Sequence, residues 1–209
     1  MNTFKTSIIY VVLLISICLP ANLVGQEIEE APSHEGFFLR FLLGGGPGSV
    51  DIDNEMNFKS SPGVLFHFQI GGEIGENLVL FGDIGGFSLT DPEMEWRGTT
   101  TTVTDASINS VGFGIGISYY IMPANIYFSG SVMLARTTIE YQDEKLGESE
   151  MGPGIFLSIG KEWWVGKSWG LGVAGFFEGA WLKDKEDDQG YKADINNTIF
   201  GIAFTATMY

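Results

Sequence analysis

A few ionisable residues lie inside the apolar segments of this chain, and they are the first candidates for a functional site. They occupy the less apolar positions of alternating segments and are Arg40, His67, Glu73, Glu162 and Glu178, with Asp83 as a further candidate. A buried charge is costly unless it is paired, so the pattern predicts a polar network that fills a barrel lumen. Arg40 and Glu73 are expected at similar heights on adjacent strands, where they would pair. The alternative is that these residues line a narrow pore or a gate.

Enzymatic chemistry is not indicated. His67 is the only histidine within the apolar segments, and no serine and acid lie at a spacing that would make it the base of a nucleophilic site. The only cysteine, Cys18, lies in the apolar N-terminal stretch, so thiol catalysis, disulfides and cysteine-based zinc sites are excluded for the rest of the chain. We predict no catalytic residue, no metal ligand and no cofactor.

Two short motifs resemble ligand sites but lack the context that those sites need. Gly170-x-Gly172-x-x-Gly175 fits a dinucleotide fingerprint, yet it lies inside an alternating segment and opens no helix. Asp51-x-Asp53-x-Glu55 resembles a calcium loop, but the required glycine is replaced by Met56. Weak binding of divalent cations by acidic loops stays open.

The composition favours β-structure. The chain has 26 Asp+Glu against 11 Lys+Arg and a formal net charge of −15, which argues against nucleic acid as a partner. Aromatic residues make up 13% of the chain, which argues against disorder. Its 29 glycines argue against helical bundles, because glycine destabilises helices.

The N-terminal residues predict export. Lys5 is followed by an apolar stretch from Ser7 to Leu19, which Pro20 ends. The stretch is short for a membrane-spanning helix, so residues 1–25 are expected to form a cleaved signal peptide. Residues 26–35 would then form a short acidic leader on the periplasmic side, and residues 36–209 a single barrel domain.

The remaining chain divides into segments in which apolar residues alternate with small or polar ones, the signature of β-strands. Residues 111–121 are the clearest case, because valine, phenylalanine, isoleucine and tyrosine alternate there with glycine and serine. Strands are predicted at about 36–50, 62–75, 77–90, 107–121, 125–141, 152–165, 168–182 and 194–209. Residues 78–90 are apolar in both phases, which a bulge near Gly85–Gly86 would explain.

The connections between these segments alternate between short and long. The long ones, at about 51–61, 91–106, 142–151 and 183–193, carry most of the acidic residues. The pattern predicts an all-β fold, an eight-stranded antiparallel up-and-down transmembrane β-barrel. Its short turns and both ends of the barrel domain would lie at one end, and its long loops at the other.

The apolar faces decide which side of the barrel meets which medium. A barrel of eight strands holds only modest side chains, and these faces carry too many large ones to fit inside. The opposite face is mostly glycine, serine, alanine and threonine, which suits a narrow lumen. The residues predicted to face lipid are Phe66, Phe68, Phe113, Ile115, Ile117, Phe128, Leu157, Val173, Phe177, Ile202 and Phe204. The predicted interfacial aromatics are Tyr119, Tyr127, Trp163, Trp169 and Trp181.

With these features the chain resembles the small eight-stranded bacterial outer-membrane barrels of the OmpA/OmpX type. The resemblance lies in the signal, the strand alternation, the loop lengths and the aromatic ending Phe204-Thr-Ala-Thr-Met-Tyr209. It implies an outer-membrane location, contact with outer-membrane lipid, and insertion by the barrel-insertion machinery, which in that family reads a terminal aromatic. Here Tyr209 is out of step with the apolar phase of its segment.

The function that fits these features is a structural or surface-exposed one. Acidic loops would meet the medium, neighbouring lipopolysaccharide through bridging cations, or an extracellular partner; loop residues such as Glu93, Trp96, Glu144 and Asp187 are the candidates. Three alternatives stay open: a small-solute pore, a membrane-bound lipid hydrolase, and an exported soluble lipocalin-like binder with its apolar face inside.

Overall fold

The computed structural model describes residues 36–53, 56–142, 144–185 and 192–209. The predicted signal peptide and acidic leader lie outside the described residues, as do Glu55 and Asp187. Within the described part of the chain, no helix is long and apolar enough to cross a membrane.

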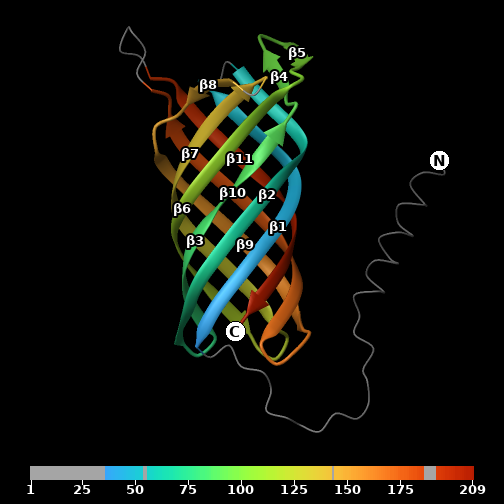
Figure 1. Ribbon diagram of the computed structural model, residues 1–209, viewed down its shortest axis with the longest axis vertical. Coiled ribbons are helices and arrows are strands. Elements are labelled where there is room, and N and C mark those ends of the chain that lie inside the picture. Colours follow the sequence, from blue (N-terminus) through green and yellow to red (C-terminus); the bar gives the residue numbers. More distant parts are fainter. Residues whose placement is uncertain (1–35, 54–55, 143, 186–191) are drawn as a thin grey trace, which may run out of the picture. The chain divides into compact units, whose positions relative to one another are not determined.

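Eight long antiparallel strands close into a barrel (Figure 1). Each pairs with its neighbours in chain order, and β1 pairs with both β2 and β11, which closes the sheet. The strands are β1 (Phe37–Ile52), β2 (Met56–Gly75), β3 (Leu78–Thr90), β6 (Ala106–Ile121), β7 (Ile126–Tyr141), β9 (Gly152–Trp164), β10 (Trp169–Lys183) and β11 (Asp194–Met208). The predicted all-β, eight-stranded up-and-down fold is confirmed.

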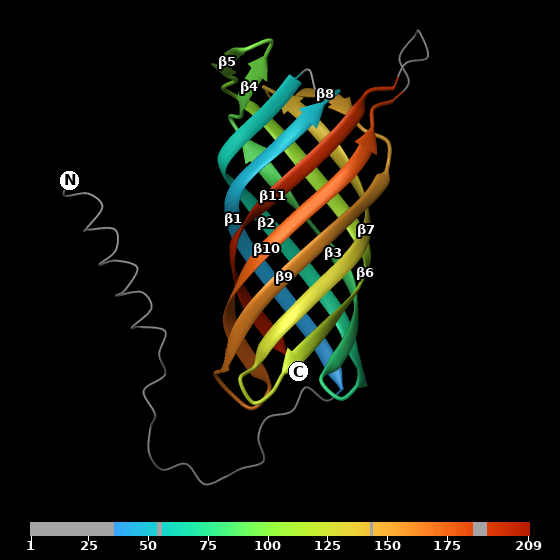
Figure 2. The same ribbon diagram turned by 180° about the vertical axis from the view of Figure 1, so that it is seen from behind.

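The two ends of the barrel differ, as expected. The tight turns β2–β3, β6–β7 and β9–β10 lie at one end together with Tyr209, and we call it the turn end (Figure 2). The other connections lie at the opposite end, the loop end. There the structure adds three short strands that the sequence analysis missed: β4 (Glu93–Trp96), β5 (Thr99–Thr102) and β8 (Glu144–Glu148). β4 pairs with β2 and with β5, and β8 pairs with β7.

The predicted first long loop, residues 51–61, is wrong. β1 runs to Ile52, β2 begins at Met56, and these two residues pair directly, so the connection is tight. The polar residues there, including Asp51 and Lys59, belong to strands that continue beyond the apolar part of the wall. These polar side chains break the apolar alternation, and a break of this kind in the sequence indicates a loop.

The outer wall carries an apolar band. Its side chains are open to the surroundings: Phe66 is 48% exposed, Ile115 65% and Phe204 75%. Toward the loop end each outward row changes character, for example from Pro47 to Ser49 on β1 and from Phe200 to Thr198 on β11. From Phe37 to Pro47 the strand rises about 33 Å, which at a tilt of roughly 35–45° is about 25 Å of height, the thickness of the apolar band of transmembrane barrels.

All the residues predicted to face lipid lie on this outer wall. Phe68 and Val173 are half-buried by their neighbours, and the other nine are exposed: Phe66, Phe113, Ile115, Ile117, Phe128, Leu157, Phe177, Ile202 and Phe204. Their contact with lipid stays a prediction.

The predicted bulge at Gly85–Gly86 is wrong. β3 pairs in unbroken register with both neighbours through these glycines. Residues at odd positions, among them Val79, Phe81 and Leu89, are buried, whereas Leu80 and Ile84 are exposed. The strand is apolar in both phases because its inner face joins an apolar core.

The lumen is therefore less polar than the sequence analysis expected. A large apolar cluster fills its loop-end half and includes Leu42, Leu65, Leu89, Ile108, Phe156, Phe176 and Ile199. Glycines on neighbouring strands make room for the rings inside a narrow barrel. A Cβ atom on Gly116 would lie 2.6 Å from the ring of Phe81, and one on Gly160 would lie 2.6 Å from the ring of Tyr127.

The apolar band predicts how charges on one strand differ in effect. Ile84 and Ser88 both face outward on β3, four residues apart, with Ile84 inside the band and Ser88 beyond it. We expect Ile84→Arg to lower the free energy of unfolding in lipid vesicles by about 2–4 kcal/mol, and Ser88→Arg by about 0–1 kcal/mol. Urea titrations of the two refolded variants measure this difference, and equal losses would contradict the placement of the band.

Candidate functional site

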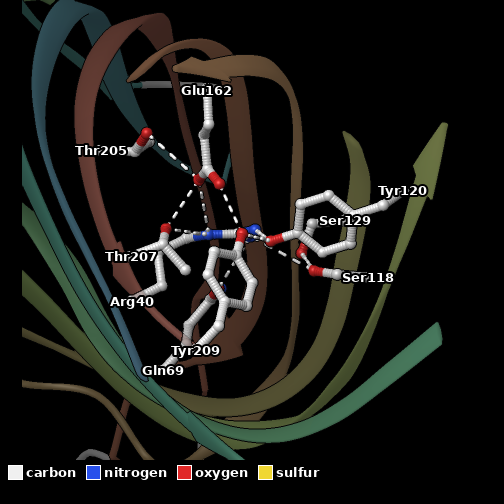
Figure 3. A network of polar contacts seen from close by, with 9 residues as sticks. All are labelled: Arg40, Gln69, Ser118, Tyr120, Ser129, Glu162, Thr205, Thr207 and Tyr209. Carbon is white, nitrogen blue, oxygen red and sulfur yellow. Dashed lines mark hydrogen bonds and ion pairs between the residues drawn. The ribbon is translucent and has the colours of Figure 1, made fainter. Parts of the chain in front are cut away.

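Polar side chains gather in the turn-end half of the lumen and form one connected site. We call its lower part the turn-end network; it comprises Arg40, Gln69, Ser118, Tyr120, Ser129, Glu162, Thr205, Thr207 and Tyr209 (Figure 3). Its upper part is the histidine cluster, which comprises His67, Asp83, Ser131 and Glu178. Every member except Tyr209 lies on a barrel strand with its side chain buried in the lumen.

Arg40 is the centre of the turn-end network. Its side chain is fully buried, and its Nε lies 3.4 Å from Oε1 of Glu162 on β9. Nε also donates to Oγ1 of Thr207, at 3.2 Å, and Nη1 donates to Oγ of Ser118, also at 3.2 Å. Nη2 donates to the hydroxyl of Tyr120, and the guanidinium lies 3.9 Å from the ring centroid of Tyr127. One cation thus ties β1 to β6, β7, β9 and β11.

The carboxylate of Glu162 also has several hydrogen-bond partners. Its carboxylate accepts hydrogen bonds from Thr207 at 2.6 Å, from Tyr209 at 2.5 Å and from Thr205 at 3.4 Å. A buried carboxylate that accepts several hydrogen bonds and faces a cation avoids most of the cost of burial. The pair therefore suits a sealed interior.

Tyr209 closes this network at the turn end. Its hydroxyl also lies 2.5 Å from that of Tyr120, from which it accepts, and its ring packs near Phe38, Tyr120 and Trp164. This inward position explains why Tyr209 is out of step with the outward phase of its strand.

Two predictions about these residues are wrong. Arg40 pairs with Glu162 and not with Glu73, because in the pairing register Arg40 faces Gln69 while Glu73 lies four residues farther toward the turn, where it is half-buried. Tyr127 is fully buried in the lumen and is not an interfacial aromatic. Adjacent strand residues face opposite sides, and Phe128 takes the outward position.

The other predicted interfacial aromatics lie on the outer wall. Tyr119, Trp169 and Trp181 are exposed and Trp163 is half-buried. Gln69, Tyr120 and Tyr209 are lumen residues that were not predicted, although Gln69 and Tyr120 share the inward phase of their strands, which is a signal for an inward side chain.

The histidine cluster brings together three of the sequence candidates, His67, Asp83 and Glu178. Nδ1 of His67 lies 2.9 Å from Oδ1 of Asp83, and Nε2 lies 3.0 Å from Oε2 of Glu178 on the far side of the lumen. The imidazole stacks on the ring of Phe156 with centroids 3.8 Å apart. Ser131 donates to Oδ2 of Asp83, at 2.6 Å.

Gln69 joins the two parts of the site. Its Oε1 accepts from Nη1 of Arg40, at 3.4 Å, and its Nε2 donates to Oδ2 of Asp83, at 3.3 Å. Polar contacts thus run from Tyr209 to Glu178. Beyond Glu178, toward the loop end, the apolar cluster fills the lumen. The largest side chains along this path, including Arg40, Tyr120, Phe156, Leu65 and His67, are less than 2% exposed, so water does not reach them and the lumen is closed.

This arrangement does not form a recognisable catalytic site. Both ring nitrogens of His67 contact carboxylate oxygens, which leaves neither to take a proton from a nucleophile. Among the described residues, no group of three or more histidine, cysteine or acidic side chains could hold a metal ion.

Ion pairs order the rim of the loop end. Glu148 on β8 contacts Lys145 at 2.8 Å, Lys185 at 2.7 Å and Arg136 at 3.2 Å. Hydrogen bonds from Lys145 and Lys185 lower the pKa of Glu148 to about 2. The candidate loop residues Glu93, Trp96 and Glu144 are exposed at this end.

Solved structures of small bacterial outer-membrane barrels have a similar fold. Neisserial surface protein A matches with a TM-score of 0.53 at 9% identity, over 83% of this chain and 97% of that protein. The outer membrane protein OprG from Pseudomonas aeruginosa matches with a TM-score of 0.46 at 12% identity, over 86% of this chain and 100% of that protein. The outer membrane protein AlkL matches with a TM-score of 0.48 at 9% identity, over 89% and 95%.

At these identities the likeness shows the fold alone. No family model matches the chain, and no curated protein sequence matches it. The resemblance to small eight-stranded outer-membrane barrels is confirmed at the level of the fold.

The buried pair of Arg40 and Glu162 yields a prediction about stability. Arg40→Met or Glu162→Met alone leaves a charge buried without its partner, and each should lower the free energy of unfolding by about 3–5 kcal/mol. The double variant should lose much less than the sum, because both charges are then gone. Urea unfolding in detergent micelles measures the three values, and additive losses would show that the two side chains are not coupled.

Proposed function

We propose that this protein is an integral outer-membrane barrel with a structural or surface-exposed role and no enzymatic activity. The observation that carries the proposal is the combination of an apolar outer band and a closed lumen. The band suits hydrocarbon in height and composition, and the closed lumen leaves the two rims as the surfaces that can meet soluble partners. Outer-membrane lipid is then the direct environment of the wall.

The loop-end rim is the surface through which the protein would act. It carries β4, β5 and β8 beyond the apolar band, with the exposed acids Glu93, Glu95 and Glu144. Such a rim suits an extracellular partner or, through bridging cations, the phosphates of neighbouring lipopolysaccharide. We infer that the barrel-insertion machinery delivers the chain to the membrane after removal of residues 1–25.

The alternatives are weaker on physical grounds. A small-solute pore needs a wet lumen, whereas Arg40, Leu65 and Phe156 seal it. A lipocalin-like binder needs a cavity inside and a polar wall, whereas side chains fill this lumen and the wall is apolar over the height of the band. A lipid hydrolase needs a nucleophile beside its base, and His67 contacts two carboxylates instead.

Cysteine labelling tests the location and the orientation together. Cys18 is the only native cysteine and lies within the predicted signal peptide. Thr100→Cys places a thiol on exposed β5, and Lys167→Cys places one at the exposed β9–β10 turn. With a membrane-impermeant maleimide on intact cells, we expect Thr100→Cys to react and Lys167→Cys to react only after lysis.

Fractionation and conductance complete that test. The protein should enter the outer-membrane fraction, run as a heat-modifiable band on gels, and give no steady conductance in planar bilayers. Solubility after removal of the signal would overturn the membrane assignment, steady conductance would favour the pore, and labelling of the turn end on intact cells would reverse the orientation.

A further inference from the structure

The histidine cluster contains more acceptors than one neutral imidazole can serve. His67 places one ring nitrogen against Asp83 and the other against Glu178, both within 3.0 Å of a carboxylate oxygen. A neutral imidazole carries one N–H, so one of these contacts would set a lone pair against an ionised carboxylate. Both contacts are hydrogen bonds only if two protons lie between the three groups.

The second proton belongs on the imidazole. In water the pKa of an imidazolium is about two units above that of a carboxylic acid, and both carboxylates face the ring. As an imidazolium, His67 donates to both.

The other neighbours of the ring do not supply an alternative charge. Gln69 on β2 and Ser131 on β7 contact Asp83 and are neutral, and Phe156 on β9 stacks on the ring. Arg40 contacts Gln69, which in turn donates to Asp83, and among the described residues no ion pair joins Arg40 to Asp83 or Glu178. The charge of His67 is therefore what offsets Asp83 and Glu178.

We propose that His67 is a proton-dependent tie across the lumen, which links β2 to β3 and β10 while both of its ring nitrogens are protonated. Loss of one proton turns one hydrogen bond into a repulsive contact and frees one wall of the closed lumen. The tie thus makes closure of the lumen sensitive to pH, a property that goes beyond the proposed surface role and does not depend on it.

The direction of the effect follows from proton binding. The folded barrel holds a proton on His67 that a histidine in the unfolded chain, exposed to water, gives up above about pH 6.5. A state that binds more protons loses stability as the pH rises. Alkaline and not acidic conditions should therefore loosen the tie, by up to about tenfold in the unfolding equilibrium constant per pH unit for one proton.

Unfolding as a function of pH tests the proposal with a matched variant. In Glu178→Gln the side-chain amide donates to Nε2, so a neutral His67 keeps both contacts and needs no second proton. Between about pH 6 and about pH 9, urea unfolding of the wild-type protein should become easier with rising pH, while that of Glu178→Gln should change little. Asp83→Asn is the equivalent variant on the other side of the ring, for use if Glu178→Gln does not fold.

Nuclear magnetic resonance tests the protonation directly. His34→Gln removes the only other histidine, so labelled histidine then reports on His67 alone. In micelles at neutral pH we expect two N–H signals for wild-type His67 and one for Glu178→Gln. A single N–H signal in the wild-type ring, or the same pH dependence of unfolding in wild type and Glu178→Gln, would overturn the proposal.

Discussion

A closed antiparallel barrel gives each strand residue only two destinations, and the rest of this structure depends on that constraint. Successive side chains face opposite sides, and closure leaves no edge where the pattern could relax. If hydrocarbon surrounds the wall, outward positions must be apolar and uncharged over the height of the bilayer. Ile115, Ile202 and Phe204 meet that demand here. Within the band, ionisable side chains such as those of Arg40, His67 and Glu178 consequently face the lumen.

Charges forced into a narrow lumen must satisfy one another. Arg40 has five hydrogen-bond or ionic partners from four strands, and Glu162 accepts from three hydroxyls. The ion pair joins β1 to β9, and two of the hydroxyl groups that bind Glu162 lie on β11. The network therefore forms only when β1, β9 and β11 have come together. It stabilises the closed barrel and does not stabilise an open sheet.

The strand pattern was predictable from the sequence because alternation is a local property. The contacts between side chains in the lumen could not be predicted, because they depend on the register between strands. Alternation in residues 111–121 located β6 to within a residue. The pairing of Arg40 with Glu73 failed because strand stagger in a barrel shifts side chains along the axis, and opposite walls bring Glu162 closer. Tyr127 was predicted to be an interfacial aromatic because tyrosine is common at membrane interfaces. Its position next to the outward Phe128 already required an inward side chain. The short strand β5 is polar on both faces, and β4 and β8, at four and five residues, are too short for alternation to mark them.

The division of the lumen into a polar and an apolar half follows from the same two-sided rule. Beyond the apolar band, outward positions such as Ser49, Ser88 and Thr198 are polar, as in a water-soluble sheet. Strands that meet water outside are stabilised by burying apolar side chains inside, and Val50, Leu89 and Ile199 do so. Below that level the wall is apolar, and the lumen holds the charged groups beside a smaller apolar cluster that includes Phe38 and Phe81. The larger apolar cluster separates the polar network from the loop-end medium. The surface of this barrel that can contact soluble partners is therefore its rim. The protonated groups of the lumen, including His67, are buried beneath the apolar cluster of the loop-end half.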